Sequence, residues 1–143
     1  MFKAVARSVG AVLASIIVGL LLLAAIEGIS AVLHPFPADF VGTPQDMMNH
    51  VANYPAWVLA LLGGGGWALT MLVIVWLATR LGSGQHPAHG YGVGALLLAA
   101  AAFNLYMLPY PLWFVLLDLV LLPAALIGGI KLATATGAVS QNE

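Results

Sequence analysis

Cysteine is absent from this chain of 143 residues, and charged side chains make up only 6% of it. The absence of thiols excludes disulfide bonds, thiolate metal sites, cysteine nucleophiles and dithiol redox chemistry. Soluble domains carry about 25% charged residues, so this composition cannot cover a surface that faces water. The net charge is only -1, without a basic run, which argues against a nucleic-acid partner. The composition therefore predicts a protein whose main partner is the lipid bilayer.

Hydrophobic runs bounded by proline, glycine and polar clusters occur four times along the sequence. Each has about 20 or more residues, the length that a helix needs to cross a bilayer. The first run follows Lys3 and Arg7 as in a secretory signal, but it is longer than the roughly 7–15 residues of a signal core. We therefore interpret it as a first span. The sequence predicts an all-α integral membrane protein, a single four-transmembrane-helix bundle with spans near 4–33, 55–81, 90–108 and 111–133.

The connection 34–54 between the first two spans is longer than the others and contains the segment TPQD. Thr43 suits the N-cap of a helix, Pro44 suits its first position, and Asp46 is favoured by the helix dipole at the third. The connection therefore predicts a short helix that lies on the membrane surface or caps the bundle. An ordered loop is the alternative.

The basic residues indicate an orientation in the membrane. With four spans, Lys3, Arg7, Arg80 and Lys131 all fall on one side. The positive-inside rule makes that side cytoplasmic. We therefore predict cytoplasmic amino and carboxyl ends, with the connection 34–54 on the outer side of a membrane that we take to be a bacterial inner membrane.

Polar or unusual residues of all four spans fall at a similar depth in the predicted outer half. At a rise of about 1.5 Å per residue, Glu27 and Asp118 each lie about 10 Å from the outer end of their span. Asn104 and a run of four glycines lie at comparable depths, and Ser30 shares a helix face with Glu27. The candidate residues for binding a ligand or a proton are Glu27, Asp118, Asn104, Ser30, Gly63, Gly64, Gly65 and Gly66.

Neither acid has a cation within predicted reach, because every Lys and Arg falls at or near the cytoplasmic side. In a low dielectric, the carboxyl groups of Glu27 and Asp118 are therefore expected to be neutral or to share a proton. A functional proton or cation site is one interpretation. A protonated carboxyl that donates a structural hydrogen bond across the bundle, for example to Asn104, is the other.

The glycine run 63–66 has three interpretations: a close helix crossing, a hinge, or backbone carbonyls that face a cavity. The aromatic residues Trp67 and Trp76 fit lipid-facing or packing positions better than a cation cage. His34 and His50 fall on the outer side without the spacing of a metal motif, and solvent-exposed loop positions suit them. We expect neither a metal nor a cofactor.

Three classes of function are compatible with these residues. The first is binding or transport of a small cationic or weakly basic solute with proton coupling. The second is an accessory subunit that docks on itself or on other membrane chains through small-residue seams. The third is a membrane enzyme acting on a lipid or isoprenoid, with the carboxyls as acid and base. No nucleophile, cofactor motif or metal set accompanies the acids, which disfavours an enzyme.

Overall fold

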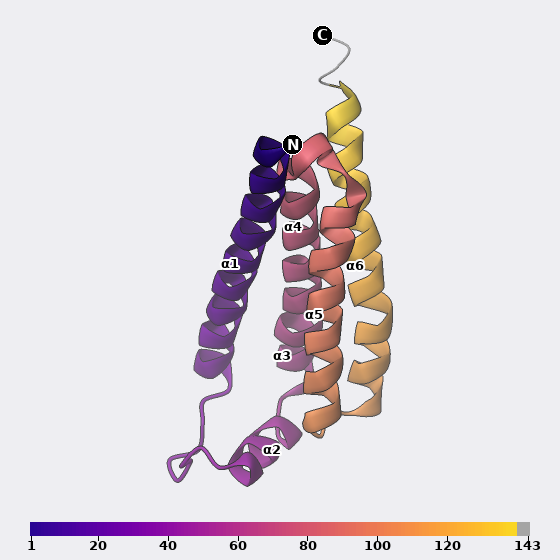
Figure 1. Cartoon of the computed structure of the whole chain (residues 1–143). Helices are drawn as coiled ribbons and strands as arrows, with labels where there is room; N and C mark the ends of the chain where they lie inside the picture. The colour runs from indigo at the N-terminus through magenta and orange to yellow at the C-terminus, as the bar shows by residue number, and fades with distance from the viewer. Residues whose placement is uncertain (140–143) are drawn as a thin grey trace.

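The computed structural model describes residues 1–139, and these form helices joined by short connections (Figure 1). The elements in chain order are α1 (Phe2–Leu33), α2 (Pro44–Ala52), α3 (Ala56–Val58), η1 (Leu59–Gly65), α4 (Gly66–Leu81), η2 (Ser83–Gln85), α5 (Pro87–Met107) and α6 (Leu112–Val139). Four helical stretches are long and apolar enough to cross a membrane: Phe2–Leu33, Ala56–Leu81, Pro87–Met107 and Leu112–Ala135. The predicted all-α bundle of four membrane helices is confirmed.

Helix α4 is the centre of the bundle and packs against α1, α5 and α6. Its buried side chains include Met71 and Val75, which meet Val93 of α5 and Leu122 of α6 in one apolar core. The buried hydroxyl of Thr70 donates to the carbonyl of Gly66, so this polar group is satisfied within its own helix. The core is therefore built around the second span, and the other three spans surround it.

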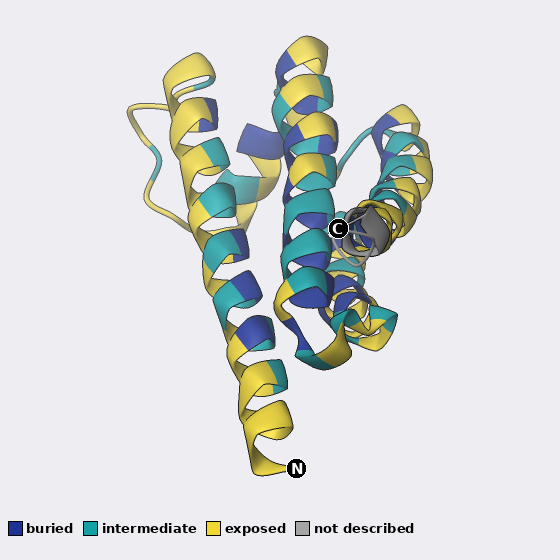
Figure 2. Ribbon diagram, turned by 90° about the horizontal axis from the view of Figure 1, so that it is seen from above, coloured by how far each residue is buried: buried dark blue, intermediate teal, exposed yellow. Residues whose placement is uncertain are grey.

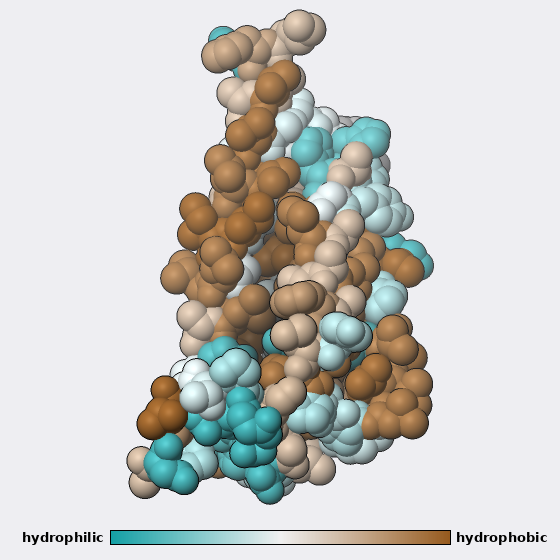
Figure 3. All heavy atoms as spheres, turned by 60° about the horizontal axis from the view of Figure 1, so that its bottom comes forward, coloured by the Kyte–Doolittle hydropathy of each residue, from teal (hydrophilic) through white to brown (hydrophobic). Residues whose placement is uncertain are grey.

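The outward faces of the bundle are apolar. Large side chains such as Leu20 on α1, Leu96 on α5 and Leu119 on α6 are exposed, and α1 buries only the side that faces the rest of the bundle (Figure 2). Hydrophobic residues cover much of the surface in Figure 3, and hydrophilic residues gather over the end that carries α2. Such a surface is stable in lipid and not in water, so these faces contact the bilayer.

The two ends of the bundle differ in composition. Both the amino terminus and the end of α6 lie at one end, which we call the terminal end (Figure 1). Arg7 lies there and donates from Nε to the carbonyl of Leu81 at 2.8 Å. The opposite end, which we call the cap end, carries α2 and the connection between α5 and α6.

Helix α2 confirms the short helix predicted in the first connection. Thr43 is its N-cap, and its side chain accepts from the backbone N–H of Asp46, whose carboxylate accepts in return from the N–H of Thr43. This reciprocal capping box satisfies two N–H groups at the start of the helix. The same hydrogen bonds hold the pKa of Asp46 below its ordinary value. The cap is therefore a specified helix and not an ordered loop.

The second span departs from a regular α-helix, which its apolar pattern did not predict. Residues Leu59–Gly65 form a π-helix that contains three of the four glycines. π-Helical segments are rare and occur frequently at functional sites.

Helix α5 begins at Pro87, earlier than predicted, because the His86 side chain caps it by accepting from the N–H of Ala88.

Candidate functional site

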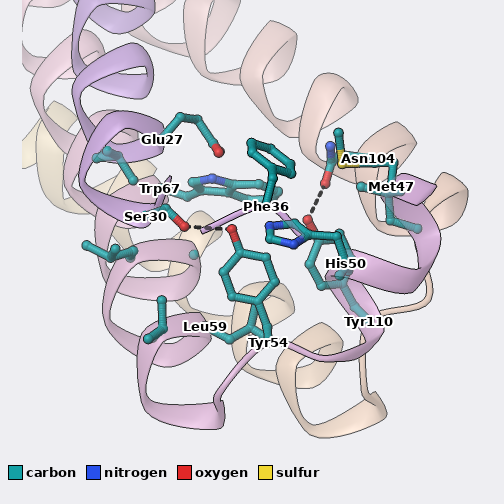
Figure 4. A pocket seen from close by; sticks show the side chains of 16 residues that line it. Glu27, Ser30, Phe36, Met47, His50, Tyr54, Leu59, Trp67, Asn104 and Tyr110 are labelled. Atoms are coloured by element: carbon teal, nitrogen blue, oxygen red, sulfur yellow. Dashed lines mark hydrogen bonds between the residues drawn. The ribbon is translucent and has the colours of Figure 1, made fainter. Parts of the chain in front are cut away.

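A cavity of about 370 Å³ lies at the cap end, between α1 and the helices η1, α4 and α5, with α2 across its outer end (Figure 4). Its walls are mainly apolar, as in most small-molecule sites. Its polar lining residues come from five different parts of the chain: Glu27, Ser30, His50, Tyr54, Asn104 and Tyr110. No Lys or Arg lines it among the residues that the structure describes.

Among the residues that the structure describes, Glu27 is the one carboxylate that lines the cavity, and it extends from α1 into it (Figure 4). Ser30, predicted on the same face of the first span as Glu27, is buried, and Gly19 of α1 packs against Ile74 of α4. Glu27 itself is an exposed residue at the side of the cavity. An acid in an otherwise apolar wall is a natural partner for a cation or a proton.

Two hydrogen bonds between side chains fix the polar walls of the cavity (Figure 4). The hydroxyls of Ser30 and Tyr54 lie 2.6 Å apart, which joins α1 to the connection that follows α2. The hydroxyl of Tyr110 donates to Oδ1 of Asn104 at 3.0 Å. The pKa of Tyr110 is raised above its ordinary value by burial first, and then by the negative charges of Glu27, Tyr54 and Asp118. Tyr110 therefore stays protonated and remains a donor.

A stack of aromatic rings closes the cavity at the cap end. The rings of His34 and His50 stack with centroids 4.4 Å apart, and Phe36 stacks on His50 at the same distance. His34 Nε2 also lies 3.3 Å from the carbonyl oxygen of His50. Only 4% of His50 is exposed, and burial, followed by the charge of His34, lowers its pKa. The interpretation of His50 as a solvent-exposed loop residue is therefore wrong.

Trp67 lines the cavity beside Gly63, although its sequence position suggested a packing or lipid-facing residue. It also packs edge-on against Phe114, with ring centroids 6.3 Å apart. A signal for His50 was present in the sequence, because His50 shares one face of α2 with Met47 and Val51 at helical spacing. No comparable signal identified Trp67, since its direction depends on how α4 packs.

Asp118 does not line the cavity. Its side chain is only 1% exposed and packs beside Gly64, where Oδ1 lies 3.6 Å from the position that a Cβ would take. Neither carboxyl oxygen has a hydrogen-bond partner among the described residues. The structure therefore brings Glu27, Ser30, Asn104 and Gly63 to one cavity, and it leaves Asp118 in the adjoining helix interface.

The remaining glycines also lie outside the cavity lining. Gly64 faces Leu117 of α6, and Gly66 faces Ile26 of α1; in each case a Cβ added to the glycine would lie 3.0 Å from the neighbouring side chain. At Gly65 nothing would approach such a Cβ closer than 3.6 Å. Of the three interpretations of the glycine run, close helix crossing describes Gly64 and Gly66. Gly63 lies at the close crossing with α6, beside Phe114, and also lines the cavity.

A scan against protein-family models, a search of curated proteins and a search of solved structures each found no match to this chain. The function must therefore be inferred from the site.

Proposed function

We propose that the protein binds a small organic cation or a weakly basic solute in the cavity, and that Glu27 supplies the counter-charge. The observation that carries the proposal is the position of Glu27, the single carboxylate in a mainly apolar cavity whose described lining contains no Lys or Arg. A carboxylate in such surroundings is stabilised by a proton or by a bound cation. Competition between the two would couple solute binding to proton release, as proton-coupled transport requires.

The aromatic lining supports a cationic ligand. Trp67, Tyr54, Tyr110 and Phe36 all contribute to the walls, and aromatic faces attract organic cations through their negative electrostatic potential. The volume of about 370 Å³ falls in the lower part of the range of roughly 300–1,000 Å³ for small-molecule sites. These features favour a compact ligand that carries one positive charge and an apolar body.

Benzyltrimethylammonium is a suitable first probe because its charge does not titrate. In lipid nanodiscs, calorimetry should detect binding near neutral pH and weaker binding on acidification, since protons then compete for Glu27. Glu27→Gln should weaken binding by about tenfold or more, which corresponds to about 1.4 kcal/mol, and should remove the pH dependence. Neopentylbenzene has nearly the same shape without the charge, and its binding should not respond to Glu27→Gln.

Asp39→Asn is the matched control, because Asp39 is an exposed acid of the connection after α1 and does not line the cavity. This variant should bind the probe as the unaltered protein does. Equal affinity and equal pH dependence in Glu27→Gln would refute the proposal. Uptake of the probe into proteoliposomes under an imposed pH gradient then distinguishes transport from binding alone.

We also propose that the termini are cytoplasmic and that the cavity lies in the outer half of a bacterial inner membrane. The support is the clustering of basic residues at the terminal end together with the positive-inside rule. Because the chain has no cysteine, single cysteines can be labelled cleanly. A membrane-impermeant maleimide added to intact cells should label Ala38→Cys and not Ser83→Cys. Reversed labelling would contradict this orientation.

A role as an accessory subunit is the second candidate, and one surface favours it. Small side chains form an exposed line along α5: Ala88, Gly92, Ala95, Ala99 and Ala102. Small residues at this spacing let another membrane helix approach closely. Native mass spectrometry of gently extracted protein separates the candidates, because an accessory subunit should be released from a complex with other membrane chains.

A further inference from the structure

The buried carboxyl group of Asp118 is unexplained by the proposed binding site. Its two oxygens are fully buried and have no hydrogen-bond partner among the described residues, whereas buried polar groups in native proteins are almost always paired. An apolar side chain would fill the same place between α6 and the π-helix without that cost. The position therefore fits a group that changes its protonation during function better than a structural group.

A short path leads from the cavity to Asp118 along the first turns of α6. Phe114 and Asp118 are four residues apart in α6, so that they lie on the same side of the helix, and Tyr110 lies in the connection just before α6. Tyr110 lines the cavity, and its ring centroid is 4.9 Å from that of Phe114. Phe114 also contacts Trp67 of the cavity wall edge-on. The Phe114 ring is 0% exposed, so it is enclosed beside these lining residues, and Asp118 lies one turn further along the same face of α6.

The π-helix forms the opposite side of this path. A Cβ at Gly63 would come within 2.7 Å of the Phe114 ring, and one at Gly64 would lie 3.6 Å from Asp118 Oδ1. Two consecutive glycines thus face the ring and the acid. Without side chains, they let the backbone of this irregular helical segment approach the ring and the acid closely.

We infer that Asp118 is a second proton-binding site, separated from the Glu27 cavity by the Phe114 ring, which acts as its gate. This inference adds a second proton-binding site to the proposed function, and the role of that site in proton exchange rests on the proposed function. When the ring moves, protonated Asp118 can pass its proton to the Glu27 carboxylate, which releases the bound cation, and the Asp118 carboxylate then takes up a proton from water that reaches the cavity. The step transfers a proton between two carboxyl groups and requires no other reactant.

The ionisable groups around Asp118 are few. Tyr110 and Glu27 lie toward the cavity, and the charges of Glu27 and Asp118 both act on Tyr110. The π-helix has no ionisable side chain. Arg80 of α4 and Lys131 of α6 each lie more than ten residues along their helix from the level of Asp118, which is roughly 20 Å by helical rise. The ionisable residues of α5 are His89, Tyr91 and Tyr106. No described cation is therefore close enough to hold Asp118 ionised.

Infrared spectroscopy of the full chain in nanodiscs tests the inference without any ligand. Near neutral pH, the carbonyl stretch of a protonated buried carboxyl should be present, and Asp118→Asn should remove it. After transfer to deuterated buffer, the shift of this band should be slow in the unaltered protein. Phe114→Ala should accelerate it by about tenfold or more, and the milder Phe114→Leu should have a smaller effect in the same direction.

Leu122→Ala is the matched control, since Leu122 is a buried residue one turn beyond Asp118 on the side away from the cavity. It should leave the exchange rate nearly unchanged. Absence of the carboxyl band, or equal acceleration by Leu122→Ala and Phe114→Ala, would overturn the inference. Because no ligand is used, these outcomes are independent of whether Glu27 binds the cationic probe.

Discussion

Gly63→Ala should destabilise the protein, whereas the same substitution at Gly65 should be neutral or stabilising. A Cβ at Gly63 would lie 2.7 Å from Cζ and 2.9 Å from Cε2 of Phe114, which is too close for two carbon atoms. Phe114 is completely buried, so its ring can withdraw only by displacing other side chains. Overpacking of this kind costs about 1–3 kcal/mol. The measurement is the free energy of unfolding in mixed micelles as the fraction of denaturing detergent rises.

Gly65→Ala controls for the change in backbone freedom, because both glycines belong to the same π-helix. At Gly65 the nearest atom would be the carbonyl oxygen of Ala60, at 3.6 Å, which is an ordinary contact. Replacing glycine by alanine in a helix otherwise gains up to about 1 kcal/mol. If the two variants unfold alike, the close contact between the π-helix and α6 does not contribute to stability as the structure implies.

The number and position of the spans were predictable because they depend on local properties. An apolar run of sufficient length forms a helix in lipid whatever its neighbours are, since its backbone groups must be paired internally. The capping box at Thr43 and Asp46 is equally local, as both partners lie within one turn. These features are set by residues that are close in sequence, and for this reason they could be read without a structure.

The composition of the site was only partly predictable. Helical rise gives the depth of Glu27 and Asp118 in the bundle, but depth does not determine which neighbour each side chain faces. That depends on the rotation of α1 and α6 around the central helix α4, which is decided by packing between distant segments. Glu27 thus faces the cavity while Asp118 packs on Gly64. The π-helix was missed because a glycine run is compatible with several backbone geometries.

Acidification should release α2 from the end of the cavity. His50 holds α2 in place through its stacking on His34 and Phe36, and its pKa lies below the ordinary value of 6.5 because it is buried and faces His34. The released state therefore binds a proton more readily than the docked state. Docking is fully stable above about pH 6.5, weakens as the pH falls below that value, and reaches its minimum below the pKa of docked His50.

Spin labels can follow this motion because the chain has no cysteine of its own. With labels at Met48→Cys on α2 and Tyr106→Cys on α5, both exposed, the distance distribution should be narrow at about pH 8 and broader, toward longer distances, at about pH 5. His50→Phe keeps an aromatic ring that cannot be protonated, so it should keep the narrow distribution at both pH values. Glu27→Gln should still respond to pH, since the response belongs to the histidine pair. A response that survives in His50→Phe and is lost in Glu27→Gln would instead assign the sensitivity to the cavity acid, and α2 would then be a fixed cover and not a pH-controlled one.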